Sequence, residues 1–393
     1  MPEPLSSLQE LIEQVSSKRF LKTVTPGDRG LADDVRFPFL GLVGQREMKT
    51  ALLLALINPA VGGVLLIGPR GTGKTTAVRS LSDLMPFVHR SLCQYGCLPE
   101  DIETGGLDAV CPDCAKKYGE GQPLTYLDPV KLIELPLNAK LEDVVGGMDE
   151  TQATVHQRMR IRRGLLAQSD KNILYIDEVN LLPDEIVDAI LDAAAQGLYT
   201  VRRGGAAATY RARFVLIGSM NPEEGRLRPQ ILDRFGLRLI VTGLSDPEER
   251  LEAYHRVRAY FTNALAMIAS YADETVAMRK EVQAARDLLP KVTLTREAEL
   301  AGLELVRRLQ VDSLRAEITL FEAARALAAA DARTQATAQD VRAVAPLTVR
   351  LRRSQFMHEY FSTQQQEEQE ITRLLDELIP AVAENSADGQ VSR

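Results

Sequence analysis

Gly68-Pro-Arg-Gly-Thr-Gly-Lys-Thr75 is the stretch that decides the fold, between the apolar run Val64 to Ile67 and helix-compatible sequence. In such a loop the glycines let backbone N–H groups surround phosphates, the lysine contacts the β- and γ-phosphates, and the threonine hydroxyl binds Mg²⁺. The expected nucleotide-binding residues are Gly68, Pro69, Arg70, Gly71, Thr72, Gly73, Lys74, Thr75 and Thr76. The stretch predicts an ATP and Mg²⁺ site, against the alternative of a glycine turn with a chance lysine.

Two adjacent carboxylates, Asp177 and Glu178, end the apolar run Ile173 to Ile176. At the carboxyl end of a buried strand the chain turns, so that both side chains can face one crevice. We expect Asp177 to hold Mg²⁺ with Thr75, and Glu178 to polarise the water that attacks the phosphate. Acidic residues at strand ends are common, so the phosphate loop is what gives this pair its meaning.

Asn221 follows a third apolar run, Phe214 to Ile217. An amide beside the first two strand ends is placed to orient the attacking water and to touch the γ-phosphate, the role called sensor 1. The alternative is a turn made by Asn221-Pro222.

Two arginines are further candidates for contact with phosphate. Arg234 lies in Leu232-Asp-Arg-Phe235 and is either a finger that reaches the next subunit's γ-phosphate or one half of a surface pair with Asp233. Arg315 lies at a predicted helix start, where the helix dipole opposes a cation unless an anion is near. That anion is either a nucleotide phosphate or Asp312.

Short apolar runs alternate with helix-like segments over residues 37–246, which predicts an α/β domain with a parallel sheet under helices. Residues 247–353 have helical periodicity throughout and predict a second, all-helical domain. Within it, Thr337-Ala-Gln-Asp340 has the form of a capping box. Residues 1–36 are expected to be a leader, and residues 354–393, rich in Gln and Glu, a solvated tail.

The composition is that of an ordinary globular protein. The net charge of -7 argues against a protein that wraps nucleic acid, since that needs a large basic surface. Residues 1–19 lack the continuous apolar core of a secretory signal, and the longest apolar stretch, 51–68, is interrupted by Asn58-Pro59. The sequence therefore predicts a cytoplasmic protein without a membrane span.

Several long motifs resemble magnesium chelatase subunit I, and the resemblance covers residues 37–353. These motifs are Phe37-Pro-Phe39 with Val43-Gly-Gln45, Leu135-Pro-Leu137 with Val145-Gly-Gly147, Tyr175-Ile-Asp-Glu-Val-Asn-Leu-Leu182, Gly218-Ser-Met-Asn-Pro-Glu-Glu-Gly225 and Leu227-Arg-Pro-Gln-Ile-Leu-Asp-Arg-Phe235. They are far more specific than the phosphate loop alone.

The resemblance implies an AAA+ P-loop NTPase that forms a hexameric ring, with a parallel-sheet core and a C-terminal helical lid. It implies Arg234 as the arginine finger and matches Arg315 to the sensor-2 arginine of the lid. In that family ATP hydrolysis drives Mg²⁺ insertion into protoporphyrin IX, together with a von Willebrand A partner and a porphyrin-binding subunit. A β-hairpin before sensor 1 is expected from Tyr199 to Arg213 around Gly204-Gly205.

The four cysteines of the chain all lie between positions 93 and 114, as Cys93-x₃-Cys97 and Cys111-x₂-Cys114. Two short-spaced thiol pairs match a four-cysteine structural Zn²⁺ site, because each pair can supply two corners of a tetrahedron. A redox switch or free thiols are the alternatives. The resemblance to a photosynthetic chelatase does not require this insertion.

Two other functions stay open. The first is a MoxR-like AAA+ chaperone that remodels or metal-loads another complex with a von Willebrand A partner. The second is a DNA-associated motor, because Arg202, Arg203, Arg211 and Arg213 cluster on the expected hairpin, although the acidic net charge disfavours it.

Overall fold

The computed structural model describes residues 35–93, 95–147, 161–203, 206–225, 227–352 and 373. The expected leader, apart from its last two residues, lies outside the described residues, as do the Gly204-Gly205 turn and the expected tail apart from Arg373. The helices and strands of the described residues belong to the compact unit that begins at Arg36.

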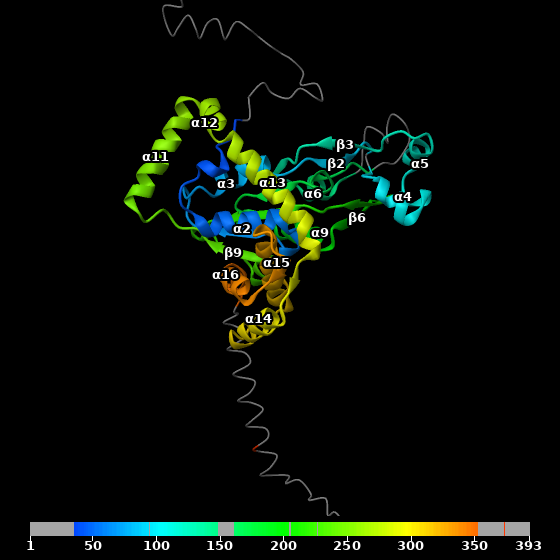
Figure 1. The fold of residues 1–393 in the computed structure, drawn as a ribbon. Helices are drawn as coiled ribbons and strands as arrows, with labels where there is room; N and C mark the ends of the chain where they lie inside the picture. Colours follow the sequence, from blue (N-terminus) through cyan, green and yellow to red (C-terminus); the bar gives the residue numbers. More distant parts are fainter. Residues whose placement is uncertain are drawn as a thin grey trace, which may run out of the picture. The chain divides into compact units, whose positions relative to one another are not determined.

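A parallel sheet forms the centre of this unit, and its strand order among the described residues is β4-β5-β8-β1-β9 (Figure 1). The strands are β4 (Leu132–Leu135), β5 (Ile173–Ile176), β8 (Val215–Met220), β1 (Val64–Ile67) and β9 (Leu237–Ile240). Every neighbouring pair is parallel, with Val64 opposite both Ile217 and Leu237. The predicted parallel α/β core is confirmed.

Strand β4 was not expected from the sequence. It lies at the edge of the sheet and carries the half-exposed Glu134, which forms an ion pair with Arg79 at 2.7 Å. A strand with one solvated face lacks the continuous apolar run that made β1 and β5 recognisable. The expected run at Phe214 also starts one residue early and stops short of Met220.

Alternate side chains of β1 enter two different apolar clusters, one on each face of the sheet. Val64 and Leu66 pack with helix α2 (Arg46–Ile57), whereas Leu65 and Ile67 pack with α9 (Asp184–Gln196). This is the period of two that a strand imposes. Further helices among the described residues before β9 include α3 (Lys74–Ser80), α6 (Leu141–Val145), α8 (Leu165–Gln168) and α10 (Pro229–Arg234).

Six helices follow β9 in the described part of the chain. They are α11 (Pro247–Thr262), α12 (Ala264–Ser270), α13 (Ala272–Leu288), α14 (Arg296–Arg308), α15 (Leu314–Ala330) and α16 (Ala338–Val349). The expectation of an all-helical region was wrong in one detail, because β10 (Thr293–Leu294) pairs with β11 (Gln335–Ala336). Strands of two residues are too short to show any periodicity.

The helices after β9 share their apolar core with one face of the sheet. Ala316, Leu320 and Ala323 of α15 belong to the same buried cluster as Val64 and the apolar side of α2. The capping box at the start of α16 is confirmed, since the N–H of Thr337 donates to Asp340 Oδ2 at 2.7 Å. Helix α15 packs against α2 and the turn that precedes β1, and α16 packs against β9.

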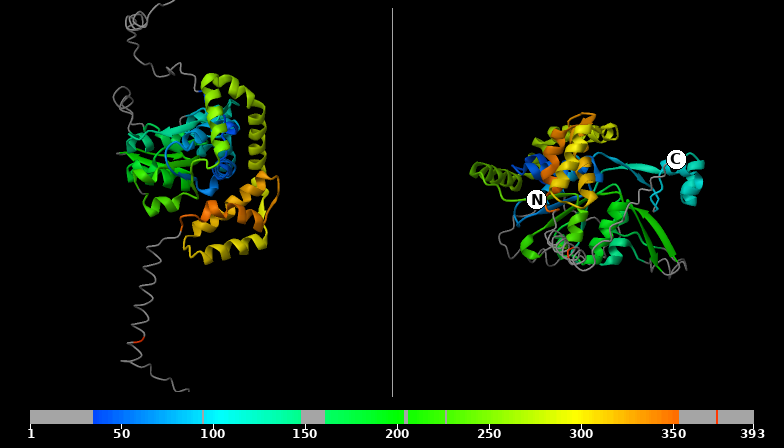
Figure 2. Two further views of the ribbon diagram at one scale, coloured as in Figure 1. Left: turned by 90° about the vertical axis from the view of Figure 1, so that its left-hand side faces the viewer. Right: turned by 90° about the horizontal axis from the view of Figure 1, so that it is seen from below.

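Two antiparallel ribbons extend this core. The expected hairpin is formed by β6 (Leu198–Arg203) and β7 (Ala206–Arg211), and β2 (Val88–Ser91) pairs with β3 (Thr125–Asp128). Between β2 and β3 the chain forms α4 (Pro99–Gly105) and α5 (Pro112–Gly119). Figures 1 and 2 agree that α4 and α5 lie at the far end of the β2–β3 ribbon from α11. We call residues 93–114 the cysteine segment; Gln94 within it is not described.

None of the helices in the described residues has the length and apolar character needed to cross a membrane.

Candidate nucleotide and metal sites

The phosphate loop connects the buried end of β1 to the start of α3. Gly71 and Gly73 adopt φ values of 77° and 84°, a left-handed region that glycine enters without steric cost. A Cβ on Gly68 would lie 2.0 Å from the carbonyl oxygen of Val241, so the loop leaves β1 pressed against the chain that follows β9. The local backbone thus requires glycine at three of the loop positions.

Lys74 lies inside this loop. Its Nζ donates to the carbonyl oxygens of Gly68 and Pro69, each at 2.7 Å, and the residue is only 9% exposed. Burial lowers the pKa of Lys74, while the charges of Asp177 and Glu178 act in the opposite direction. The ammonium is therefore held among carbonyl oxygens, where a phosphate can replace them as its partner.

The two residues expected to bind Mg²⁺ come together around one hydroxyl. Tyr175 Oη lies 3.2 Å from Thr75 Oγ1 and donates to Asp177 Oδ1 at 2.8 Å. Ser219 Oγ also donates to Asp177 Oδ1, from the neighbouring strand β8. This group of oxygen atoms without sulfur or nitrogen suits a hard cation such as Mg²⁺.

Glu178 lies beside them in a left-handed conformation with φ 55°, which is unusual for a residue with a Cβ and typical of functional sites. Its N–H donates to Ser219 Oγ at 3.1 Å. Its carboxylate pairs with Arg70 of the phosphate loop at 3.1 Å, and Arg70 also pairs with Glu224 at 2.5 Å. Arg70 thus links Glu178 to the phosphate loop at the carboxyl-terminal ends of the strands.

Asn221 completes this row of side chains at the end of β8. Its Nδ2 donates to Glu224 Oε1 at 3.3 Å, and its Oδ1 accepts from the N–H of Glu223 at 3.3 Å. The alternative, an Asn-Pro turn, is therefore present, and it uses the amide oxygen. The amide nitrogen contacts Glu224, so the turn leaves the sensor role of Asn221 open as a prediction.

Three residues of this site were missed by sequence reasoning: Tyr175, Ser219 and Glu224. A signal existed for the first two, because each lies two positions before a predicted site residue on a strand. Side chains at that spacing point to the same face. Of the other expected loop residues, Thr72 donates its Oγ1 hydrogen to the Pro69 carbonyl at 3.1 Å, and Thr76 is exposed.

Arg234 and Arg315 lie near the amino-terminal ends of the sheet strands, whereas the phosphate loop lies at their carboxyl-terminal ends. Val64 pairs in parallel with Leu237, so Arg234, just before β9, is level with the start of β1, whereas the loop follows its end. Arg234 pairs with Asp192 at 2.9 Å and Asp188 at 3.7 Å. The structure does not bring either arginine to the phosphate loop of its own chain.

Arg315 follows the first residue of α15, as the sequence predicted, and the carboxylate that it contacts is that of Asp233. Its Nη1 contacts Asp233 Oδ2 at 3.3 Å. Arg315 and Arg234 line one cavity of about 160 Å³ together with Asp192 and Asp233. Both arginines are therefore available on one surface, near the carboxylates that offset their charge.

Asp233 also neutralises two buried cations, Arg238 and Arg352, whose side chains are 1% and 0% exposed. Burial lowers the pKa of Arg238 to about 9, assisted by the charge of Arg352 and opposed by that of Asp233. Asp233 thus stands between the buried guanidiniums and the exposed one of Arg315.

We expect Asp233→Ala to reduce the free energy of unfolding by about 2–3 kcal/mol, since it leaves two buried charges unpaired, although partial exposure of the carboxylate moderates the loss. Chemical denaturation measures this. The control is Asp184→Ala, which removes the exposed pair with Arg228 and should cost under about 1 kcal/mol. Equal losses in both variants would contradict this role for Asp233.

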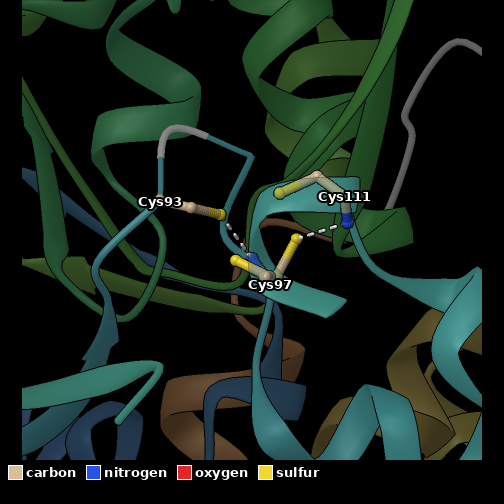
Figure 3. A group of neighbouring side chains, drawn as sticks. Cys93, Cys97 and Cys111 are labelled. Atoms are coloured by element: carbon tan, nitrogen blue, oxygen red, sulfur yellow. Dashed lines mark hydrogen bonds between the residues drawn. The ribbon is translucent and has the colours of Figure 1, made fainter. Parts of the chain in front are cut away.

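The four cysteines form a second candidate site, and three of them, Cys93, Cys97 and Cys111, are labelled in Figure 3. Their Sγ atoms all lie within 4.8 Å of one another, close to the spacing of about 3.8 Å that tetrahedral Zn–S bonds of 2.3 Å require. The N–H groups of Cys97 and Cys111 donate to the sulfurs of Cys93 and Cys97 at 3.4 and 3.3 Å. Such donors favour thiolates, the form that binds a metal.

The thiols of this cluster differ in acidity. Burial opposes ionisation of Cys93, but hydrogen bonds from Ser91 and the Cys97 backbone lower its pKa to about 6. Burial raises the pKa of Cys97 to about 11 and raises that of Cys114 as well. One thiol is thus prepared to ionise first, and a bound cation would be needed to hold all four as thiolates.

The basic hairpin surface on which the DNA-motor alternative rested is partly neutralised. Arg211 pairs with Asp101, and Arg213 with Asp170 at 3.5 Å. Arg202 remains exposed. Two of the four hairpin arginines are therefore bound to carboxylates of the same chain.

Comparison with known proteins places these sites in a family. A model described as AAA lid domain matches residues 303–374, and one described as MCM P-loop domain matches residues 147–250. The chain is 41% identical over 323 residues to a magnesium-chelatase subunit ChlI homolog of Methanocaldococcus jannaschii, covering 81% of this chain and 87% of that protein. It is 41% identical to the magnesium-chelatase 38 kDa subunit of Acidiphilium rubrum, covering 80% of this chain and 90% of that protein.

The chain belongs to the magnesium chelatase subunit I family. It is an AAA+ ATPase with a P-loop domain and a lid domain. A solved structure of a putative ATPase from Cytophaga hutchinsonii shares the fold, with a TM-score of 0.51 and 21% identity over 80% of this chain and 84% of that one. The resemblance recognised in the sequence motifs is confirmed.

Proposed function

We propose that this chain is the ATP-hydrolysing motor subunit of a magnesium-chelatase-type complex that inserts Mg²⁺ into protoporphyrin IX. The observation that carries the proposal is the 41% identity to the magnesium-chelatase 38 kDa subunit of Acidiphilium rubrum over 90% of that protein. Its partners in the proposal are a von Willebrand A protein and a porphyrin-binding subunit. The motor comprises an ATPase domain at 37–246 and a lid at 247–353.

In the proposed reaction, the phosphate loop binds ATP through its backbone N–H groups and Lys74. Thr75 and Asp177 hold Mg²⁺, which neutralises charge on the phosphates. Glu178 polarises the attacking water, and Asn221 orients it. The support is the contact network that already joins Thr75, Tyr175 and Asp177 on one side and Arg70, Glu178 and Glu224 on the other.

The proposal includes a ring, with six subunits as the expected number. Arg234 and Arg315 line one cavity near the amino-terminal ends of the sheet strands, away from their own phosphate loop. An arginine there can stabilise transition-state charge only on a nucleotide bound by a neighbouring subunit. We therefore assign both arginines to the subunit interface, Arg234 as the finger and Arg315 as the sensor of the lid.

The test is an affinity pull-down with Glu178→Gln protein in the presence of ATP, because AAA+ rings that cannot hydrolyse ATP retain their partners. We expect a von Willebrand A protein and a large porphyrin-binding protein, and porphyrin metallation when wild-type motor is added to them. Recovery of a different complex with a von Willebrand A protein, and no porphyrin-binding protein, would favour the MoxR-like chaperone instead.

We further propose that the four cysteines hold a structural Zn²⁺. Protein purified without added metal is expected to contain about one zinc per chain, as a closed tetrahedral site requires. Elemental analysis measures this, and thiol titration of the native protein should find Cys93, Cys97, Cys111 and Cys114 protected until a chelator is added. Metal-free protein with four freely reactive thiols would contradict the zinc site.

A further inference from the structure

Arg211, the last residue of β7, contacts the cysteine segment although it lies far along the chain from it. Its Nη1 donates to the carbonyl oxygen of Gly96 at 3.0 Å, and its Nη2 pairs with the carboxylate of Asp101. The side chains of Arg211 and Asp101 are 32% and 16% exposed, so this pair is partly shielded from water. A charge-assisted pair in such a place is stronger than an exposed one.

Both acceptors, the carbonyl of Gly96 and the side-chain carboxylate of Asp101, belong to residues of the segment that positions the thiols. Gly96 lies between Cys93 and Cys97, with φ 77°, and its N–H donates to the Cys93 carbonyl at 3.4 Å. Asp101 Oδ2 accepts from the N–H of Leu98 at 2.8 Å, which fixes the start of α4 next to Cys97. Opening the cysteine site would therefore move both partners of Arg211.

The two strands that carry the hydrolysis residues start next to these contacts. Asn172, directly before β5, accepts from Arg90 of β2 at 2.8 Å, and Lys171 donates to the His89 carbonyl at 2.9 Å. From Arg211 the chain runs through Arg213 straight into β8, which carries Ser219 and leads to Asn221. The ribbon that bears the cysteine segment and the hairpin thus meet at the start of the catalytic strands.

We propose that the cysteine segment stabilises the β6–β7 hairpin through Arg211, so that metal in the four-cysteine site determines how often the hairpin opens. The metal dependence rests on the zinc site proposed above. The Arg211 contact itself does not, because it is made to backbone and carboxylate oxygens. Tyr210 anchors the hairpin independently, since it is buried and its Oη donates to the Ile161 carbonyl at 3.3 Å.

The experiment is hydrogen–deuterium exchange of the full chain, read on peptides covering residues 198–203 and 206–211. Arg211→Gln removes the charged pair, and Asp101→Asn removes it from the other side while an amide oxygen can still cap α4. The matched control is Arg213→Gln, two residues further on, which loses its pair with Asp170, a carboxylate outside the cysteine segment, and whose charge acts on Asp101 only as a coulombic effect without an ion pair. Zinc content is measured on every sample.

We expect chelation to speed hairpin exchange in the wild type by about tenfold, the effect of losing one charge-assisted hydrogen bond on a local opening. Arg211→Gln and Asp101→Asn should already exchange at that faster rate, with little further response to the chelator. Arg213→Gln should respond as the wild type does.

Two results would overturn the proposal. The first is a hairpin exchange rate that, in protein purified with zinc, changes neither on chelation nor in Arg211→Gln. The second is an Arg213→Gln variant whose hairpin exchanges as fast as that of Arg211→Gln. Absence of zinc in the wild type refutes the metal site and the metal dependence. Arg211→Gln and Asp101→Asn then test the contact alone, and unchanged exchange in both refutes it. Failure of the chelatase assignment would appear in the pull-down and not in these measurements.

Discussion

Lys74→Ala protein is expected to lose ATP binding, whereas Glu178→Gln protein binds ATP and stops hydrolysing it. Lys74 Nζ lies in the centre of the loop on the Gly68 and Pro69 carbonyls, so its loss removes a contact made with the bound phosphates. Glu178 lies beyond Asp177, and its loss removes water activation, for which about 10²–10⁴-fold in kcat is typical. Nucleotide titration and phosphate release measure the two effects separately.

The control for both is Glu185→Gln, which changes the same functional group on the exposed side of α9 and should leave binding and turnover unchanged. Near wild-type turnover in Glu178→Gln would remove Glu178 from the catalytic role. Tight ATP binding by Lys74→Ala would show that backbone N–H groups alone hold the phosphates, and that the lysine serves a different purpose.

The sequence was sufficient for the parts of this site that are local in the chain. The strand Val64 to Ile67 is matched residue for residue by β1, because a strand buried on both faces must be apolar throughout. The glycines next to it have the backbone angles that the loop pattern requires. Asp177 and Glu178 follow β5 directly, so their position at the carboxyl-terminal end of that strand could be predicted without knowledge of the rest of the fold.

Contacts between distant segments could not be predicted in the same way. Asp233 meets Arg315 and Arg352 only because α15 packs against α2 and α16 packs against β9, and no local pattern encodes which carboxylate a distant cation will contact. The link from Arg211 to Gly96 likewise depends on the path of the hairpin beside α4. The spacing of the cysteines predicted that the four thiols would lie together, but it did not predict the contact of Arg211 with the segment that carries them.

The position of Arg234 and Arg315 near the amino-terminal ends of the strands is the most consequential feature that depends on distant segments. Taken alone, Arg234 was more typical of a surface pair with Asp233, and the structure pairs it with Asp188 and Asp192. What decides its proposed role is the parallel register of β1 and β9, which separates it from Lys74 of the same chain by the length of the strands. The proposed interface role rests on this geometry together with the proposed ring.

Arg234→Ala chains are therefore expected to bind ATP with unchanged affinity and to lose hydrolysis by a factor of about 10³ or more, since a finger acts mainly on the transition state. Arg315→Ala should behave similarly, because it shares the cavity with Arg234. The control is Arg228→Ala, directly before the helix that ends at Arg234, which loses exposed pairs with Asp184 and Asp188 and should hydrolyse ATP normally.

Mixing two inactive variants separates action across the interface from action within the chain. An Arg234→Ala subunit keeps Lys74 and Glu178, so its pocket can be completed by a neighbour that carries Arg234 but is itself inactive through Glu178→Gln. Rings assembled from both should regain part of the ATPase activity, with a maximum at intermediate mixing ratios because productive pairs need one subunit of each kind. Mixed rings that form but stay inactive at every ratio would mean that Arg234 works within its own subunit or only pairs with Asp192.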